Sequence, residues 1–218
     1  MDPLKNRPRL IDRLQLRLSS GRLLDGLWIG TDEDKSELVL EKVEAALRLI
    51  KTRDPRRYDR LRRDLSRIWV RLLAGARGSF NASLSACELD ARFVLAEERK
   101  PVELASVIVH EATHARIHRA GIRYRAELRH RIEAACFREE AAFARTVPDG
   151  ESVRERAERW LKAPQEYWSD ASLEQEFVEG SAEALRQLGV PRWIVVMVRK
   201  LRPVGKMIRR LASGLTRA

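Results

Sequence analysis

The feature that most constrains this chain is a pair of histidines, His110 and His114, four residues apart within a predicted helix over residues 101–120. Pro101 lies in the first turn, where proline is favoured. Side chains at positions i and i+4 of a helix lie on one face about a turn apart, so both imidazoles can reach a single ion. Glu111 is turned about 100° away and therefore flanks that ion without having to bind it.

The HExxH spacing predicts a zinc centre of the kind that hydrolytic enzymes use. A catalytic zinc ion has three protein ligands and leaves one position for water. Glu111 is placed to take a proton from this metal-activated water as general base. His118 continues the spacing, but along a straight helix it lies about 12 Å from His110 and cannot reach the same ion. The third ligand must come from another segment.

The next predicted helix, over residues 125–145, offers glutamates as candidates. Glu133 falls on its apolar face, Glu140 returns to within about 20° of Glu133, and Glu139 points away. A carboxylate on a buried face is costly unless it is paired or bound to a metal. We predict that Glu133 is the third ligand, and that Glu140 is either the alternative ligand or a partner that orients a ligand histidine. Cys136, on the same face, is interpreted as a buried structural thiol.

The HExxH motif, with Glu133 nineteen residues after His114, resembles the gluzincin arrangement of thermolysin-like zinc metallopeptidases. The resemblance covers about residues 87–143. It implies that Zn²⁺ is held by His110, His114 and Glu133, and that the substrate is a peptide or protein. It also implies that a strand near residues 89–95 lines the cleft and pairs with the substrate in extended form.

The same resemblance gives Tyr124 a catalytic role, because gluzincins often have a tyrosine between the second histidine and the glutamate that stabilises the oxyanion. His118 or His130 is expected to help it. A weaker similarity, carried by residues 140–144, is to cytoplasmic repressor-cleaving metallopeptidases. That alignment makes Glu140 the metal ligand, so the choice between Glu133 and Glu140 stays open.

Hydrophobic periodicity indicates an α+β fold that is predominantly helical, with a small antiparallel sheet packed against the HExxH helix and the glutamate-bearing helix. Two alternating runs, at residues 67–72 and 88–95, predict strands separated by a loop over residues 75–83. The predicted helices are at residues 10–24, 35–54, 56–64, 101–120, 125–145, 153–161 and 173–188.

Three regions are expected along the chain, together forming one compact unit. Residues 1–64 form an N-terminal helical region, residues 65–150 a zincin-like catalytic core, and residues 151–218 a C-terminal helical region with a basic tail. Trp160, Tyr167 and Trp168 are interpreted as packing for the C-terminal helices.

The charge balance points to a partner that tolerates negative charge. Lys and Arg number 43 against 32 Asp and Glu, a net charge of +11. From Pro191 onward there are eight Lys or Arg and no acidic residue. Such a tail is usually just solvated, and docking on an anionic membrane or on nucleic acid is the alternative interpretation. With two cysteines and no apolar stretch long enough to span a bilayer, we expect a cytoplasmic protein that can be peripheral to the membrane.

Two functions are compatible with these features. The first is a zinc-dependent metallopeptidase that hydrolyses a peptide bond by metal-activated water, with Glu111 as general base. The alternative is a basic helical binding or regulatory protein, acting on nucleic acid or an anionic membrane, whose metal site is vestigial or structural. Zinc content and hydrolysis, measured together, distinguish the two.

Overall fold

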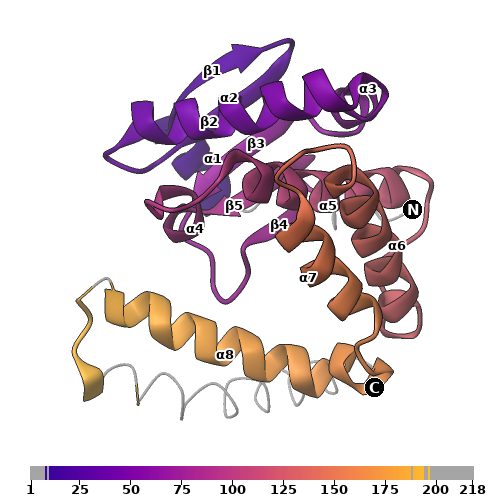
Figure 1. The fold of residues 1–218 in the computed structure, drawn as a ribbon. Helices are drawn as coiled ribbons and strands as arrows, with labels where there is room; N and C mark the ends of the chain where they lie inside the picture. Colours follow the sequence, from indigo (N-terminus) through magenta and orange to yellow (C-terminus); the bar gives the residue numbers. More distant parts are fainter. Residues whose placement is uncertain (1–7, 9, 188, 194–195, 197–218) are drawn as a thin grey trace.

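The computed structural model describes residues 8, 10–187, 189–193 and 196, and most of these are helical (Figure 1). The helices are α1 (Leu10–Leu18), α2 (Ser36–Arg53), α3 (Pro55–Asp64), α4 (Ala91–Leu95), α5 (Pro101–Arg119), α6 (Ala126–Ala144), α7 (Glu151–Leu161), the 3-10 helix η2 (Gln165–Trp168) and α8 (Asp170–Gln187). The strands are β1 (Ser20–Leu24), β2 (Leu27–Thr31), β3 (Arg67–Arg71), β4 (Gly78–Asn81) and β5 (Ala86–Asp90). Long helices packed on a small sheet confirm the predicted, predominantly helical α+β fold.

The five strands lie in the order β1-β2-β3-β5-β4. The edge strands run antiparallel to their neighbours, whereas β2, β3 and β5 are parallel to one another. The prediction of an antiparallel sheet is therefore wrong for the two strands that alternation indicates, because Ile68 of β3 lies opposite Cys87 of β5 in a parallel pair. The reason is that the predicted loop contains β4, so the chain reverses direction twice between β3 and β5.

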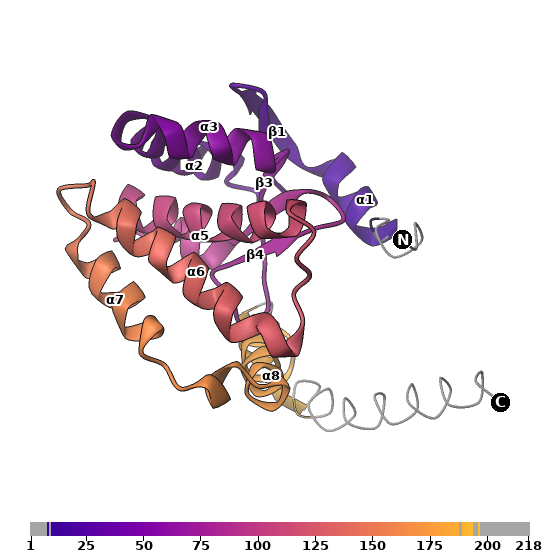
Figure 2. The same ribbon diagram turned by 90° about the vertical axis from the view of Figure 1, so that its right-hand side faces the viewer.

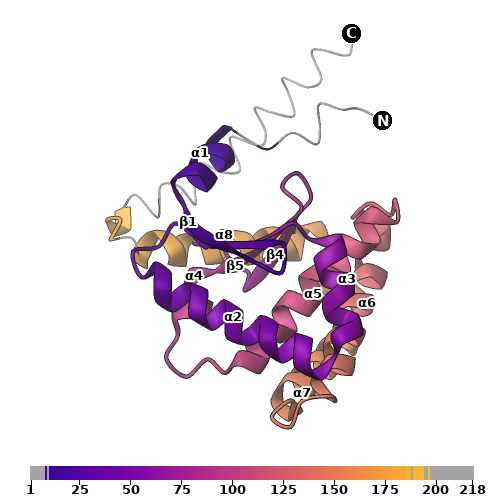
Figure 3. The ribbon, with the colours of Figure 1, turned by 90° about the horizontal axis from the view of Figure 1, so that it is seen from above.

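The sheet separates two unequal layers (Figures 2 and 3). Ile68 and Val70 of β3 belong to the main hydrophobic core, which they share with residues of α2 and α5. Trp69, between them, points to the other face of the sheet. There it belongs to a small hydrophobic cluster, against which Leu16 of α1 packs. The alternation of this strand thus has the predicted effect, since the core-facing residues position α5 against the sheet.

The first predicted helix is shorter than expected, because α1 ends at Leu18 and residues 20–24 form β1. Strands β1 and β2 form a hairpin whose turn, Asp25-Gly26, has positive φ at both residues, 51° and 83°. Residues 1–64 are therefore not purely helical, and β2 joins the sheet by pairing with β3. All three predicted regions contribute to one hydrophobic core, which extends from Leu27 to Val153.

The predicted strand over residues 88–95 also ends early. The carboxylate of Asp90 accepts a hydrogen bond from the backbone N–H of Arg92 and caps α4, so the chain leaves the sheet there. Strand β5 is flanked by β3 and β4 on its two sides. It therefore cannot pair with a peptide, and the expectation that this strand receives an extended substrate is wrong.

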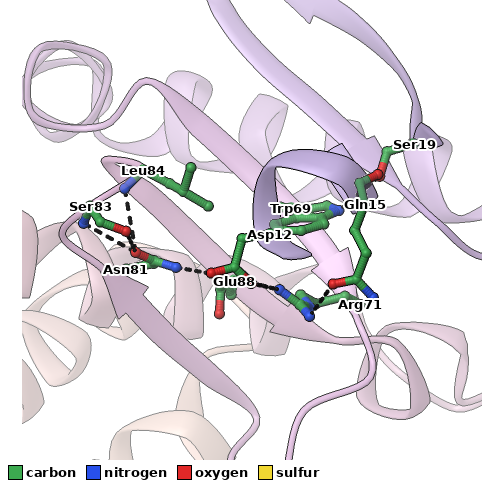
Figure 4. Close-up of polar contacts among 9 residues, drawn as sticks. All are labelled: Asp12, Gln15, Ser19, Trp69, Arg71, Asn81, Ser83, Leu84 and Glu88. Carbon is green, nitrogen blue, oxygen red and sulfur yellow. Dashed lines mark hydrogen bonds and ion pairs between the residues drawn. The ribbon is translucent and has the colours of Figure 1, made fainter. Parts of the chain in front are cut away.

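A polar network on the α1 side of the sheet fixes the edge strand β4 (Figure 4). Asn81 of β4 donates a hydrogen bond of 2.8 Å to Glu88 of β5, and Glu88 lies 3.9 Å from the guanidinium of Arg71 in β3. Arg71 in turn binds Asp12 and Gln15 of α1, at 3.1 and 2.7 Å. Side chains from three strands and one helix thereby hold β4 at the rim of the sheet.

Helix α8 runs beside the loop that connects β3 and β4 (Figure 1). A Cβ at Gly180 of α8 would lie 2.0 Å from the Cα of Gly75 in that loop, so only glycine permits this approach. Most of the basic tail after Pro191 lies outside the described residues. Within the described part of the chain, no helix is both long and apolar enough to cross a bilayer.

The carboxylate of Glu139 joins α6 to helices α3 and α5. Glu139 accepts hydrogen bonds from Arg57 of α3 at 2.8 Å and from Arg116 of α5 at 3.0 Å. Burial by itself would raise the pKa of Glu139, but the two guanidinium groups outweigh burial and hold the pKa below its usual value. Glu139 thus fastens α6 to both α3 and α5.

We predict that Glu139→Gln lowers the free energy of unfolding by about 1–3 kcal/mol at neutral pH, because charge-assisted hydrogen bonds to two arginines are lost. Since the folded pKa is lowered, this contribution should be complete above the unfolded glutamate pKa of about 4.3. It should disappear as the pH falls through the folded value. Urea titrations at several pH values measure the difference. Glu127→Gln, at an exposed position of the same helix, is the control, and equal stability of the two variants at neutral pH would contradict the prediction.

Candidate metal centre

Two helices bring the predicted ligands together. Helices α5 and α6 lie side by side (Figure 2), with the histidines on α5 and the glutamate on α6. The Nε2 atom of His110 lies 3.3 Å from Oε2 of Glu133, and Nε2 of His114 lies 3.5 Å from Oε1 of the same carboxylate. Two imidazole nitrogens and one carboxylate are a donor set found in hydrolytic zinc sites, so these residues fit the ion.

Glu140 lies on the other side of the His110 ring. Its Oε2 accepts a hydrogen bond of 3.3 Å from Nδ1 of His110, and its Oε1 lies 2.6 Å from Arg156, which also contacts Ser106. The two nitrogens of an imidazole point in different directions, so Glu140 is not placed to share an ion held by Nε2 of His110. The geometry favours Glu133 as the ligand and Glu140 as the partner that orients His110.

Glu111 lies beside the centre, where the edge strand meets α5. A Cβ at Gly78 of β4 would be 2.6 Å from a methyl group of Val107 and 3.2 Å from Oε1 of Glu111. The bare backbone of Gly78 therefore lets β4 approach Glu111 closely. Burial raises the pKa of Glu111, although His110 and His114 act against this effect. A carboxyl group with a raised pKa is better matched to proton transfer near neutral pH.

The charges of the centre are strongly coupled. Burial opposes a charge on His110, but hydrogen bonds to Glu133 and Glu140 outweigh it and raise the pKa of His110 to about 10. Burial would likewise raise the pKa of Glu133, yet the hydrogen bonds with His110 and His114 lower it. A metal ion at these atoms therefore competes with a proton on His110, so its binding releases protons.

Tyr124 lies next to Glu133, the predicted third ligand. Its hydroxyl donates a hydrogen bond of 2.6 Å to Oε1 of Glu133, and its ring packs edge-on against His114. His118 lines the same cleft as Tyr124. His130 lines a separate depression beside the start of α8, so the expectation that His130 assists Tyr124 is not supported.

Cys136 is a further possible metal donor, although the sequence analysis interpreted it as a buried structural thiol. One donor atom each from His110, His114 and Cys136 lies within 4.8 Å of the other two. The Glu133 oxygens are closer to the histidine nitrogens, at 3.3 and 3.5 Å. Burial, with a further contribution from Glu133, raises the pKa of the Cys136 thiol. The shorter distances favour Glu133 over Cys136 as the predicted third ligand and leave Cys136 in the wall of the candidate centre.

Two clefts meet at the centre. The first, of about 400 Å³, lies between β4 and the C-terminal half of α5, beside Tyr124. The second, of about 350 Å³, lies between the loop that precedes β4 and helices α6, α7 and η2. His110, Glu111 and Glu133 line both clefts, so the candidate metal site is accessible from two sides.

The second cleft contains residues that sequence reasoning missed or interpreted differently. Trp160, Tyr167 and Trp168, interpreted as packing for the C-terminal helices, line this cleft together with Arg156. Three aromatic residues within nine positions were the only feature of the sequence that could have indicated this cleft. Nothing in the local sequence indicates that the cluster faces the histidine pair, because that depends on how α7 packs on α6.

No family model, curated protein or solved structure matches this chain. The likeness to gluzincins therefore remains an expectation carried by the motif and its spacing. The geometry adds an independent observation, since the motif and the glutamate of a separate helix face each other across a buried interface.

Substitution with Co²⁺ tests the donor set. We expect the cobalt protein to show visible d–d absorption without a thiolate-to-cobalt charge-transfer band, because nitrogen and carboxylate atoms hold the ion. Glu133→Ala should weaken metal affinity by more than about 10-fold. Loss of a residue that only orients a ligand already costs about that much, and loss of the ligand itself should cost more. Cys136→Ser should bind the ion as the wild type does, with Cys87→Ser as control for the loss of a buried thiol. A charge-transfer band that vanishes only in Cys136→Ser would show that the thiol is a ligand.

Proposed function

We propose that this protein is a zinc-dependent metallopeptidase of the gluzincin type. His110, His114 and Glu133 hold the ion, Glu140 orients His110, and Glu111 is the general base. The observation that supports this most strongly is the convergence of both Nε2 atoms on one carboxylate, beside a second, separate carboxylate that faces the cleft. A structural zinc site needs no such second carboxylate.

Zn²⁺, when bound, supplies Lewis acidity that polarises a substrate carbonyl and makes water a stronger acid. Glu111 accepts the proton of the attacking water and delivers it to the leaving nitrogen. Its raised pKa suits both steps, because a base must also be able to act as an acid in the same turnover. Glu140 keeps Nδ1 of His110 engaged, so that Nε2 faces Glu133, where the ion would bind.

The substrate binds as an additional strand at the free side of β4. Among the described strands, β4 pairs only with β5, so its other side can accept backbone hydrogen bonds from an extended peptide. Gly78 lies in this strand directly beside Glu111, which brings the backbone of such a peptide to the general base. Strand β4 thus takes the role that the sequence analysis gave to residues 89–95.

Tyr124 stabilises the oxyanion that forms during attack. Its hydroxyl lies 2.6 Å from Glu133 and its side chain lines the cleft, so a small rotation redirects it from the ligand to the substrate. The pKa of Tyr124 is raised, mainly by burial and by Glu133, which keeps the hydroxyl protonated and able to donate.

The proposed location is a reducing compartment, the cytoplasm, because both cysteines are buried free thiols. The basic tail provides a means of peripheral docking on an anionic membrane or on nucleic acid. The substrate is a peptide or protein segment that is locally extended, since the edge strand can pair only with such a backbone.

The variant Glu111→Gln tests the role of the general base. It should retain zinc at wild-type stoichiometry, because Glu111 is not a ligand, while hydrolysis of an unfolded protein substrate falls by about 10²–10⁴-fold. Zinc analysis and peptide release measure the two effects, with Glu98→Gln, an exposed glutamate that precedes α5, as control. Zinc binding with no hydrolysis of a broad peptide library by the wild type would instead favour a binding protein with a structural metal site.

The variant Tyr124→Phe separates the two roles that this hydroxyl could have. If it donates to the oxyanion, kcat should fall by about 10²–10³-fold while KM and metal affinity change little. If it only holds Glu133, metal affinity should fall and added zinc should restore kcat. We expect the first result, and recovery of activity at high zinc concentration would contradict it.

A further inference from the structure

We call the second cleft the aromatic pocket, because four aromatic side chains form one of its walls. These are Phe137 of α6, Trp160 of α7, and Tyr167 and Trp168 of η2. The rings of Phe137 and Trp160 are stacked, with centroids 5.7 Å apart and planes 12° from parallel. Trp160 also contacts Tyr167 and Trp168, at 4.9 and 5.7 Å. Phe137 lies edge-on to the ring of His110, with centroids 4.7 Å apart, so the aromatic pocket begins at the metal centre.

None of these four aromatic residues belongs to the hydrophobic core. Each is partly exposed, and Tyr167 retains 37% of its surface. Large aromatic side chains normally bury most of their surface, and a concave apolar wall that remains open beside reactive groups is a typical ligand site. The remaining apolar surface is therefore available to a side chain of the substrate.

The same pocket contains one arginine without an anionic partner. Arg156 is already bound to Glu140, whereas Arg77, in the loop before β4, forms no ion pair with any described residue. The guanidinium of Arg77 makes a cation–π contact with Phe93, with its Cζ atom 5.4 Å from the centroid of the ring. Burial, with Arg156 and Arg99 nearby, lowers the pKa of Arg77, although Glu103 and Glu140 act against this effect. An anion in direct contact with Arg77 would favour its charged form further.

The loop that carries Arg77 leads directly into the proposed substrate strand. Residues 75–78 line the aromatic pocket, and Gly78 is also the first residue of β4. Gly180 of α8 packs against Gly75 and supports this loop from outside. A peptide laid along β4 therefore passes the metal centre and then places its next residues between Arg77 and the aromatic wall.

We propose that the aromatic pocket selects substrates in which a bulky aromatic side chain, adjacent to the cleaved bond, is followed by a carboxylate that binds Arg77. The aromatic side chain stacks on Trp160 and Phe137, and the carboxylate comes from an acidic residue or from the C-terminus of the peptide. This inference rests on the proposed peptidase activity of the same centre. It adds the class of substrate, which the metal ligands alone do not specify.

A matched set of peptides tests the proposal with the zinc-loaded full-length protein. Each peptide has Phe or Ala at the position that enters the pocket, followed by Glu, by Gln, or by a terminus that is either a free carboxylate or an amide. We expect kcat/KM to be about 10–100-fold higher for Phe than for Ala, the range that one apolar subsite provides. Glu should exceed Gln, or the free terminus should exceed the amide, and this comparison identifies the source of the carboxylate.

Three variants assign these preferences to residues. Arg77→Gln should abolish the discrimination between carboxylate and amide, and Tyr167→Ala or Trp160→Ala should reduce the ratio of Phe to Ala. Substitution of Tyr167 should disturb folding less because Tyr167 is more exposed than Trp160, and circular dichroism verifies that each variant is folded. Arg131→Gln, at an exposed position of α6, should leave both ratios unchanged.

Failure of this inference can be distinguished from failure of the proposed function. Cleavage of all peptides at equal rates would overturn the aromatic pocket as a selective site and leave the peptidase intact. If no peptide is cleaved, tryptophan fluorescence of zinc-loaded Glu111→Gln decides. Quenching by the Phe-Glu peptide that is lost in Glu111→Gln/Arg77→Gln supports the pocket, and the absence of quenching overturns it.

Discussion

The contact between two imidazoles of α5 and one carboxylate of α6 is the interaction on which the site depends. The Glu133 oxygens lie 3.3 and 3.5 Å from the Nε2 atoms of His110 and His114, inside a helix interface that excludes most water. A buried carboxylate and a buried imidazolium are each unfavourable alone, and here each compensates the other. A divalent cation would satisfy the same atoms, so the interface is already organised for one.

The helices could be predicted from the sequence because their signals are local. The predicted helices over residues 101–120 and 125–145 agree with α5 and α6 to within one residue at each end. Helical geometry also identified Glu133 and Glu140 as members of one face, and separated Glu139 from them. What it could not determine was which nitrogen of His110 each glutamate would face, since that depends on the offset between two packed helices.

The sheet was harder to predict because strand pairing is not local. Strand β4 has only four residues and is too short to show an alternating pattern. Because this strand was not predicted, β3 and β5 were expected to pair antiparallel, whereas they pair in parallel. The hairpin at Asp25-Gly26 did carry a signal, the Asp-Gly pair, which the apolar spacing of the preceding helix obscured. The aromatic residues of α7 and η2 could be seen in the sequence, but their position beside the candidate metal centre comes from tertiary packing alone.

Helix α6 sets an unusual limit on how this chain can diverge. Within two turns it presents Glu133 to both histidines and Glu140 to the far side of His110, while Glu139 between them is fastened to α3 and α5. Inserting or deleting one residue anywhere between positions 133 and 140 would turn one end of this segment by about 100° relative to the other. The length of this segment should therefore be as invariant among any relatives as the three glutamates that it positions.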